Sequence, residues 1–85
     1  MTLNITVYSR GETCQQCTAT TRRMDRHGVA YREEALDEHP NVVAYAKEQG
    51  WTSAPVVMVF DVTGQLVAAW SGFRPDKIKE VANAG

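Results

Sequence analysis

The alternation of hydrophobic and polar positions along the chain predicts four β-strands. Apolar and polar residues alternate with a period of two near the N-terminus, as in a strand with one buried face. Five consecutive apolar residues further on are typical of a strand buried on both faces. Asp61–Gln65 predicts a hairpin turn before the last strand, and a more polar segment suits a sheet edge. The predicted strands span residues 3–8, 30–36, 56–60 and 66–70.

Three helices are predicted between and after these strands. We expect Thr13 to cap the first helix and Gly28 to follow its end in the left-handed conformation that glycine adopts readily. Proline is favoured at the first helical position, so Pro40 and Pro75 indicate the starts of the second and third helices, and Gly50 ends the second. The helices begin near residues 14, 37–40 and 75. The residues expected to face the core in the second helix are Val42, Val43, Tyr45 and Ala46. Those expected to face it in the third helix are Ile78, Val81 and Ala82.

The resulting order is βαβαββα, which predicts an α/β fold with one mixed four-stranded sheet and three flanking helices on its two faces. The first two strands should be parallel because a helix connects them, and the last two should form an antiparallel hairpin. With 85 residues the chain has the length of one domain, so we expect a single domain over residues 1–85.

Composition and charge exclude several functional classes. The hydrophobic fraction of 44% and the charged fraction of 22% are ordinary for a globular domain. A net charge of −1 gives no attraction to nucleic acid or to anionic membranes, so any partner must be recognised by local surfaces. No run approaches the about 20 apolar residues that a membrane span needs, and the N-terminus lacks the pattern of a signal peptide. We therefore expect a cytoplasmic protein.

The two cysteines, Cys14 and Cys17, stand three positions apart between the first strand and the first helix. Thiols at this spacing at a helix start can open and close a disulfide with little backbone movement. Unpaired N–H groups and the helix dipole should lower the pKa of Cys14, with Arg10 adding to this effect. Cys14 is therefore the predicted attacking thiolate, and the more buried Cys17 is the predicted resolving thiol.

The two cysteines have two other interpretations besides a redox role. They can be ordinary core residues, or they can bind zinc together with His27 and His39. The spacing of these histidines matches no zinc-finger pattern, and a disulfide in the reducing cytoplasm is more often catalytic than structural. We therefore expect a dithiol–disulfide oxidoreductase with no metal and no cofactor beyond the Cys14–Cys17 disulfide. A C-x-x-C pair beside a βαβ unit is also a sign of the thioredoxin-like fold.

Four segments give the chain a resemblance to the NrdH-redoxins, the glutaredoxin-like dithiol proteins that feed electrons to class Ib ribonucleotide reductases. The resemblance covers nearly the whole chain. Three of the segments occur loosely across glutaredoxin relatives, whereas the last is specific to this family. The segments are Ile5–Ser9, Cys14–Thr20, Ala54–Val57 and Trp70–Ile78.

The resemblance implies a thioredoxin-like fold and reduction by thioredoxin reductase rather than by glutathione. It implies two protein partners, thioredoxin reductase and the large subunit of class Ib ribonucleotide reductase, and we expect a monomer. The chain departs from the family in two places that can alter partner contacts. The loop from Tyr8 to Cys14 is one residue longer than usual and lacks a proline often found there, and the stretch from Val56 to Trp70 is longer than the family's short hairpin.

The resemblance also favours a cis bond before Pro55, although position alone equally allows a trans proline at the start of a strand. In the resembling families this proline faces the two cysteines, and the residue before it offers backbone groups to an extended substrate. Trp70 is expected either to pack against the sheet or to contact a partner, and Trp51 either to contact a partner or to cap the core. The neutral Gln15 and Gln16 either tune the site or face solvent. The candidate partner-binding residues are Gln15, Gln16, Trp51, Ala54, Pro55, Trp70, Ser71, Gly72, Phe73 and Arg74.

Three alternative functions stand beside the electron carrier. A metal- or cluster-carrying role is disfavoured by the two cysteines, because iron–sulfur glutaredoxins usually use a single thiol together with glutathione. A glutathione-dependent glutaredoxin binds the anionic tripeptide with basic side chains and a Gly-Gly-x-(Asp/Ser) turn. The corresponding turn here, Ser71–Arg74, has one glycine and a bulky aromatic residue, which argues against that function. A non-enzymatic binding module would use a thioredoxin-like surface as a clamp, but a clamp needs no exposed dithiol.

Overall fold

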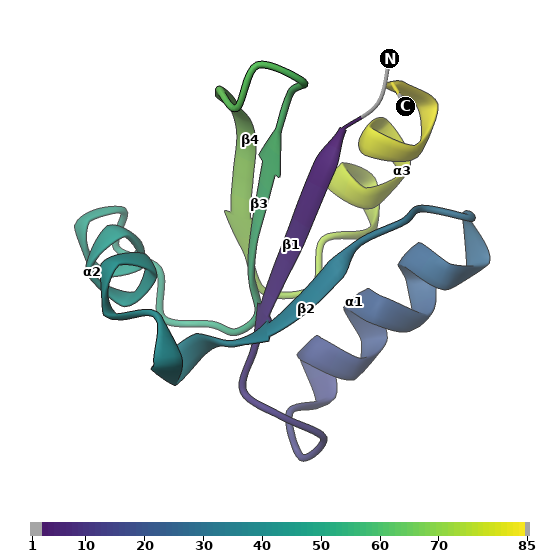
Figure 1. Ribbon diagram of the computed structural model, residues 1–85. Helices are drawn as coiled ribbons and strands as arrows, with labels where there is room; N and C mark the ends of the chain where they lie inside the picture. The colour runs from purple at the N-terminus through teal and green to yellow at the C-terminus, as the bar shows by residue number, and fades with distance from the viewer. Residues whose placement is uncertain (1–2, 85) are drawn as a thin grey trace.

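The computed structural model describes residues 3–84 and contains one four-stranded sheet with a helix layer on each face (Figure 1). Helices α1 and α3 lie on one side of the sheet and α2 lies on the other, so the predicted thioredoxin-like arrangement βαβαββα is confirmed. The elements are β1 (Asn4–Ser9), α1 (Gln15–Arg26), β2 (Arg32–Ala35), the 3₁₀ turn η1 (Leu36–Glu38), α2 (Pro40–Glu48), β3 (Val56–Phe60), β4 (Leu66–Ser71) and α3 (Pro75–Ala84).

The strands are arranged in the order β2-β1-β3-β4. Strands β1 and β2 are parallel, while β1 with β3 and β3 with β4 are antiparallel, so both predicted strand relationships are confirmed. The polar strand β2 lies at an edge, as its charged residues predicted. Strand β4 forms the other edge and contains a bulge, because Val59 pairs with Ala68 and Phe60 pairs with Leu66, which leaves Val67 unpaired with β3.

Two hydrophobic clusters cover the two faces of the sheet. Alternate residues of β3 point to opposite faces, so Val57 enters one cluster and Val56 the other. The larger cluster lies under α1 and α3, and the smaller one lies under α2. The buried members of the larger cluster are Ile5, Val7, Met24, Val57, Val59, Trp70, Ile78 and Val81, and those of the smaller are Val42, Ala46, Val56 and Met58.

The ends of α1 place the two cysteines and the following strand. The N-cap of α1 is Cys14, one residue later than the predicted Thr13, because the Cys14 sulfur takes the place of a capping oxygen. At the other end, Gly28 has a φ of +70°, and the N–H of Val29 donates to the Met24 carbonyl at 2.9 Å. This Schellman motif satisfies a carbonyl of the last turn and turns the chain toward β2, as predicted from Gly28.

The β3–β4 hairpin is closed by Asp61. Its Oδ1 accepts hydrogen bonds from the N–H of Thr63 at 2.9 Å and of Gln65 at 3.1 Å, and also from the Thr63 hydroxyl. The Thr63 hydroxyl is the main cause that lowers the pKa of Asp61 below its ordinary value, with the backbone N–H groups adding to it. This turn lies at the end of the sheet opposite the start of α1 (Figure 1). No helix within residues 3–84 has the length and apolar character needed to cross a membrane.

Candidate redox site

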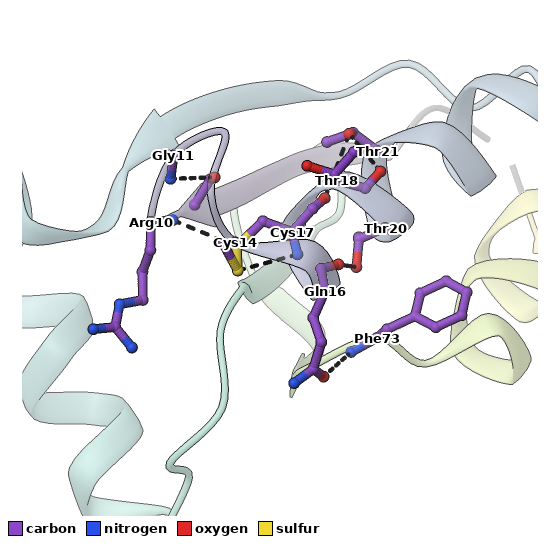
Figure 2. Close-up of a disulfide and its surroundings, with 10 residues drawn as sticks. Arg10, Gly11, Cys14, Gln16, Cys17, Thr18, Thr20, Thr21 and Phe73 are labelled. Carbon is purple, nitrogen blue, oxygen red and sulfur yellow. Dashed lines mark hydrogen bonds between the residues drawn. A yellow bond between two sulfur atoms is a disulfide. The ribbon is translucent and has the colours of Figure 1, made fainter.

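Cys14 and Cys17 form a disulfide at the start of α1 (Figure 2). Their Cα atoms are 5.2 Å apart, a separation that a disulfide bridges without rearrangement of the backbone. Cys14 is partly exposed, whereas Cys17 is 1% exposed. An incoming thiol or disulfide can therefore reach Cys14. Cys17 is shielded from partners in solution and can react only with the neighbouring Cys14 sulfur.

The backbone at the start of α1 is placed to stabilise negative charge on Cys14 once the disulfide is reduced. The N–H of Cys17 donates to the Cys14 sulfur at 3.2 Å, and this sulfur lies at the N-terminal end of the helix dipole. Hydrogen-bond donation and the dipole both favour the thiolate over the thiol. This geometry supports the attacking role proposed for Cys14.

Arg10 contacts the site differently from the sequence-based expectation. Its backbone N–H donates to the sulfur of Cys17 at 3.4 Å, while its guanidinium points away from the disulfide (Figure 2). The loop is held by a further hydrogen bond, in which the Ser9 hydroxyl accepts from the N–H of Gly11 at 3.0 Å. The expected contribution of the Arg10 charge to Cys14 is thus replaced by a backbone contact to Cys17. A backbone contact of this kind is independent of residue type, so no sequence signal could have identified it.

The Ala54–Pro55 peptide bond is cis, as predicted. Both residues are buried, Ala54 at 7% exposure and Pro55 below 2%. The carbonyl of Pro55 accepts a hydrogen bond from the N–H of Gly72 at 2.8 Å. The segment before β3 is therefore joined to the turn between β4 and α3.

Gln16 joins the same turn to the cysteine pair. Its Oε1 accepts a hydrogen bond from the backbone N–H of Phe73 at 3.0 Å (Figure 2). Gly72 lies directly against this amide, because a Cβ atom at position 72 would be 2.9 Å from Gln16 Oε1 and 3.3 Å from the Cβ of Ser53. The structure thus brings Gln16 together with Gly72 and Phe73. It also places Ser53 beside Gly72, a residue that is not among the candidates predicted from the sequence.

The two tryptophans both pack against the sheet. Trp70 is 3% exposed and belongs to the larger hydrophobic cluster, so the packing alternative describes it and direct partner contact does not. Its indole N–H is buried and has no hydrogen-bond partner within residues 3–84. Trp51 is partly buried and makes an edge-to-face contact with Tyr45, with 5.7 Å between ring centroids. It borders the smaller cluster and keeps part of its surface open.

The remaining candidates are Gln15, Ser71 and Arg74. Gln15 is exposed and Ser71 is partly buried at the end of β4. Arg74 is exposed and makes two hydrogen bonds to the carboxylate of Asp76, at 3.2 and 3.0 Å. The hydrogen bonds of this pair raise the pKa of Arg74 and lower the pKa of Asp76 from their ordinary values.

An open groove of about 920 Å³ lies beside the redox site. It is bounded by the 9–11 loop, the end of β2, α2 and the segment before Pro55. It shares Arg10 with the surroundings of Cys17 and includes the partly open Trp51. Its charged lining residues have mixed signs and are Arg10, Glu33, Glu34, Asp37 and Lys47. Residues 3–84 contain no group of three or more His, Cys, Asp or Glu side chains arranged to hold a metal ion.

Comparison with known proteins agrees with this geometry. The sequence pattern of the glutaredoxin family matches residues 5–66. The glutaredoxin-like protein NrdH of Salmonella typhimurium is 37% identical over 79 residues, covering 93% of this chain and 89% of the relative. The glutaredoxin-like protein NrdH of Lactococcus lactis subsp. cremoris is 35% identical over 78 residues, covering 92% and 99%.

Solved structures give the same assignment. NrdH-redoxin from Escherichia coli, a glutaredoxin-like protein described as having a thioredoxin-like activity profile, superposes with a TM-score of 0.73. It is 36% identical and the match covers 92% of this chain and 93% of that one. Mitochondrial thioredoxin 3 from Saccharomyces cerevisiae, at 18% identity and a TM-score of 0.66, covers 98% of this chain and 78% of its own and shares the fold. The chain therefore belongs to the glutaredoxin family and, within it, to the glutaredoxin-like NrdH proteins.

Proposed function

We propose that this thiol–disulfide oxidoreductase is an electron carrier that is reduced by thioredoxin reductase and that reduces the large subunit of a class Ib ribonucleotide reductase. Membership of the NrdH proteins supports the choice of ribonucleotide reductase as the acceptor. The structure of the 71–75 turn supports the choice of a protein, rather than glutathione, as the donor.

The proposed reaction is a pair of thiol–disulfide exchanges. The Cys14 thiolate attacks one sulfur of the acceptor disulfide, forming a mixed disulfide and releasing the other acceptor sulfur as a thiolate that takes up a proton. Cys17 then loses its proton and attacks the Cys14 sulfur, which forms the Cys14–Cys17 disulfide and releases the second acceptor thiol. Two electrons pass to the acceptor. The dithiol of thioredoxin reductase, which draws electrons from NADPH, returns two electrons by the reverse exchange.

The observation that carries the choice of donor is that the hydrogen-bond donors of the 71–75 turn are already bonded within the protein. Glutathione has two carboxylates, and its binding requires donors that are free to receive them. The Phe73 N–H is bonded to Gln16, Pro75 has no N–H, and the Arg74 guanidinium is bonded to Asp76. An exposed pair such as Arg74–Asp76 contributes only about 0–1 kcal/mol, but a carboxylate must still displace Asp76 to reach Arg74.

The groove beside the site supports the same choice. Its lining combines two cations with three carboxylates, a mixture that gives an anionic tripeptide no net attraction. A protein surface can instead contact the partly open Trp51 and the 71–75 turn together, because such surfaces combine apolar and charged groups.

The test compares two regenerating systems with a common disulfide acceptor, insulin. NADPH consumption is measured with thioredoxin reductase, and separately with millimolar glutathione and glutathione reductase. We expect efficient turnover with thioredoxin reductase and poor turnover with glutathione, and no turnover of Cys14→Ser in either system. Faster turnover with glutathione would show that the protein is a glutathione-dependent glutaredoxin and would overturn the proposal.

The acceptor is tested by reconstitution with a class Ib ribonucleotide reductase. Deoxyribonucleotide formation should depend on NADPH, thioredoxin reductase and the wild-type protein together. Cys14→Ser should abolish it. Product formation that is unchanged when the protein is omitted would remove ribonucleotide reductase from the proposal.

A further inference from the structure

We propose that Gln16 is a positioning residue that holds the 71–75 turn against the cysteine pair in the conformation that a protein reductase binds. This inference rests on the proposed function, in which a protein supplies the electrons. From sequence alone Gln16 either tunes the site or faces solvent, whereas this inference assigns it a structural contact with the 71–75 turn.

The hydrogen bond from Phe73 to Gln16 is unusual among the polar contacts of this protein. It joins residues 57 positions apart, whereas every other side-chain hydrogen bond within residues 3–84 spans seven positions or fewer. Gln16 is exposed, and a bond from an exposed side chain to a distant backbone group must offset the entropy of fixing that side chain. The bond therefore fixes a relationship between two segments that local sequence preferences do not determine.

The packing at Gly72 shows that the turn is shaped to receive this amide. Gly72 is buried and has a φ of +77°, a conformation that residues with a Cβ rarely adopt. The space that a Cβ would need at position 72 is occupied by Gln16 Oε1 at 2.9 Å and bordered by Ser53. The absence of a side chain at Gly72 thus allows the Gln16 amide to lie against the backbone of the turn.

Two further contacts extend this link across the active face. The Arg23 guanidinium carbon lies 5.6 Å from the centre of the Phe73 ring, so α1 holds the turn at a second point. The N–H of Gly72 donates to the Pro55 carbonyl, which connects the turn to the segment before β3. The cysteine pair, the cis-proline segment and the 71–75 turn are thereby held in one arrangement.

The geometry indicates that Gln16 positions the turn and takes no direct part in the thiol–disulfide exchange. Gln16 Oε1 accepts from the Phe73 N–H, so that oxygen is directed at the turn and not at the sulfur atoms (Figure 2). The amide is also neutral, so its removal leaves the charge near Cys14 unchanged. Loss of Gln16 should therefore weaken recognition by the reductase more than the exchange of electrons.

The test is steady-state reduction of the protein by thioredoxin reductase and NADPH, with insulin as final acceptor. Gln16→Ala should raise KM about three- to tenfold with kcat little changed, the factor expected from one neutral hydrogen bond that holds a binding-competent conformation. Gln16→Glu keeps an oxygen that can accept from Phe73, so its KM should return toward the wild-type value. Its added charge should slow alkylation of reduced Cys14, which Gln16→Ala should not do.

Gln65→Ala is the matched control, because it removes the same amide from an exposed residue in the hairpin at the other end of the sheet. It should leave KM at the wild-type value. Amide hydrogen exchange at Phe73, measured by NMR, gives a readout that needs no reductase. Exchange at Phe73 should be faster in Gln16→Ala than in the wild type, and unchanged in Gln65→Ala and Gln16→Glu.

An unchanged KM in Gln16→Ala, or a lower kcat with the same KM, would overturn the proposal. Unchanged exchange at Phe73 in Gln16→Ala would overturn it as well. If the wild-type protein itself is not reduced by thioredoxin reductase, the proposed function fails. Phe73 exchange then decides alone whether Gln16 positions the turn.

Discussion

At the scale of single residues, the difference between the two cysteines comes from burial and from which backbone groups they meet. Cys14 is partly exposed and accepts from the N–H of Cys17 at the helix terminus. Cys17 is 1% exposed and accepts from the N–H of Arg10. The first arrangement favours a thiolate that solvent and partners can reach. The second keeps the other sulfur away from solvent, beside the Cys14 sulfur that it attacks to resolve a mixed disulfide.

This difference predicts unequal reactivity. In the reduced protein at neutral pH, iodoacetamide should alkylate Cys14 rapidly and Cys17 slowly, because only Cys14 combines exposure with stabilisation of the thiolate. Peptide mapping by mass spectrometry at short reaction times measures both rates. Urea-unfolded protein is the control and should show similar rates for the two thiols. Equal rates in the folded protein would contradict the assignment of Cys14 as the attacking thiol.

The same assignment predicts which single variant traps a partner. Cys17→Ser should accumulate a mixed disulfide between Cys14 and a substrate, because no second thiol is present to resolve it. Cys14→Ser should accumulate none. Non-reducing electrophoresis after incubation with a disulfide substrate gives the result, and trapping by Cys14→Ser alone would reverse the roles of the two residues.

At the scale of elements, periodicity and end signals were sufficient to place most helices and strands. The five apolar residues of β3, the polar edge strand β2 and the glycine after α1 each have a local physical cause, so sequence reasoning found them. The cap of α1 is Cys14 rather than the predicted Thr13, because threonine is a common capping residue and a cysteine sulfur an uncommon one. The contacts of Gln16 and Arg10 could not be predicted, since they depend on how separate backbone segments meet in space.

The β3–β4 hairpin has a pH dependence that the structure predicts. The pKa of Asp61 is lowered in the folded state relative to its ordinary value of 3.8. A lowered folded-state pKa contributes stability that is present above pH 3.8 and is lost as the pH falls through the folded-state pKa. The carboxyl of Asp61 should therefore titrate below pH 3.8 in a carbon-detected NMR titration.

Asp61→Asn serves as the comparison for this group, because it keeps an oxygen acceptor but cannot titrate. The difference between the unfolding free energies of the wild type and Asp61→Asn should be constant above the ordinary pKa and shrink as the pH falls below it. The contributions of all other carboxylates, including Asp76, to the pH dependence are the same in both proteins and cancel in this difference. A titration midpoint at or above the ordinary value would show that the turn does not stabilise the charged form.

At the scale of the whole molecule, one sheet is shared by two hydrophobic clusters. Neighbouring residues of β3 belong to opposite clusters, so the layer of α1 and α3 and the layer of α2 depend on the same backbone. The tryptophans report on the two sides, because Trp70 is buried in the larger cluster and Trp51 borders the smaller one. Small proteins built in this way usually unfold in one cooperative transition.

We therefore expect both faces of the sheet to unfold together and to respond equally to a change on one face. In Trp51→Phe the fluorescence of Trp70 should give the same urea midpoint as far-UV circular dichroism. In Trp70→Phe the fluorescence of Trp51 should also give the midpoint that circular dichroism gives.

Met24 is fully buried in the larger cluster, so Met24→Ala should lower the unfolding free energy by about 2–5 kcal/mol, the cost of a large-to-small change in a core. When Met24→Ala is combined with Trp51→Phe or with Trp70→Phe, the urea midpoint should fall by the same amount whether it is measured by the remaining tryptophan or by circular dichroism. A shift of the Trp70 transition that leaves the Trp51 transition in place would show that the two layers unfold independently.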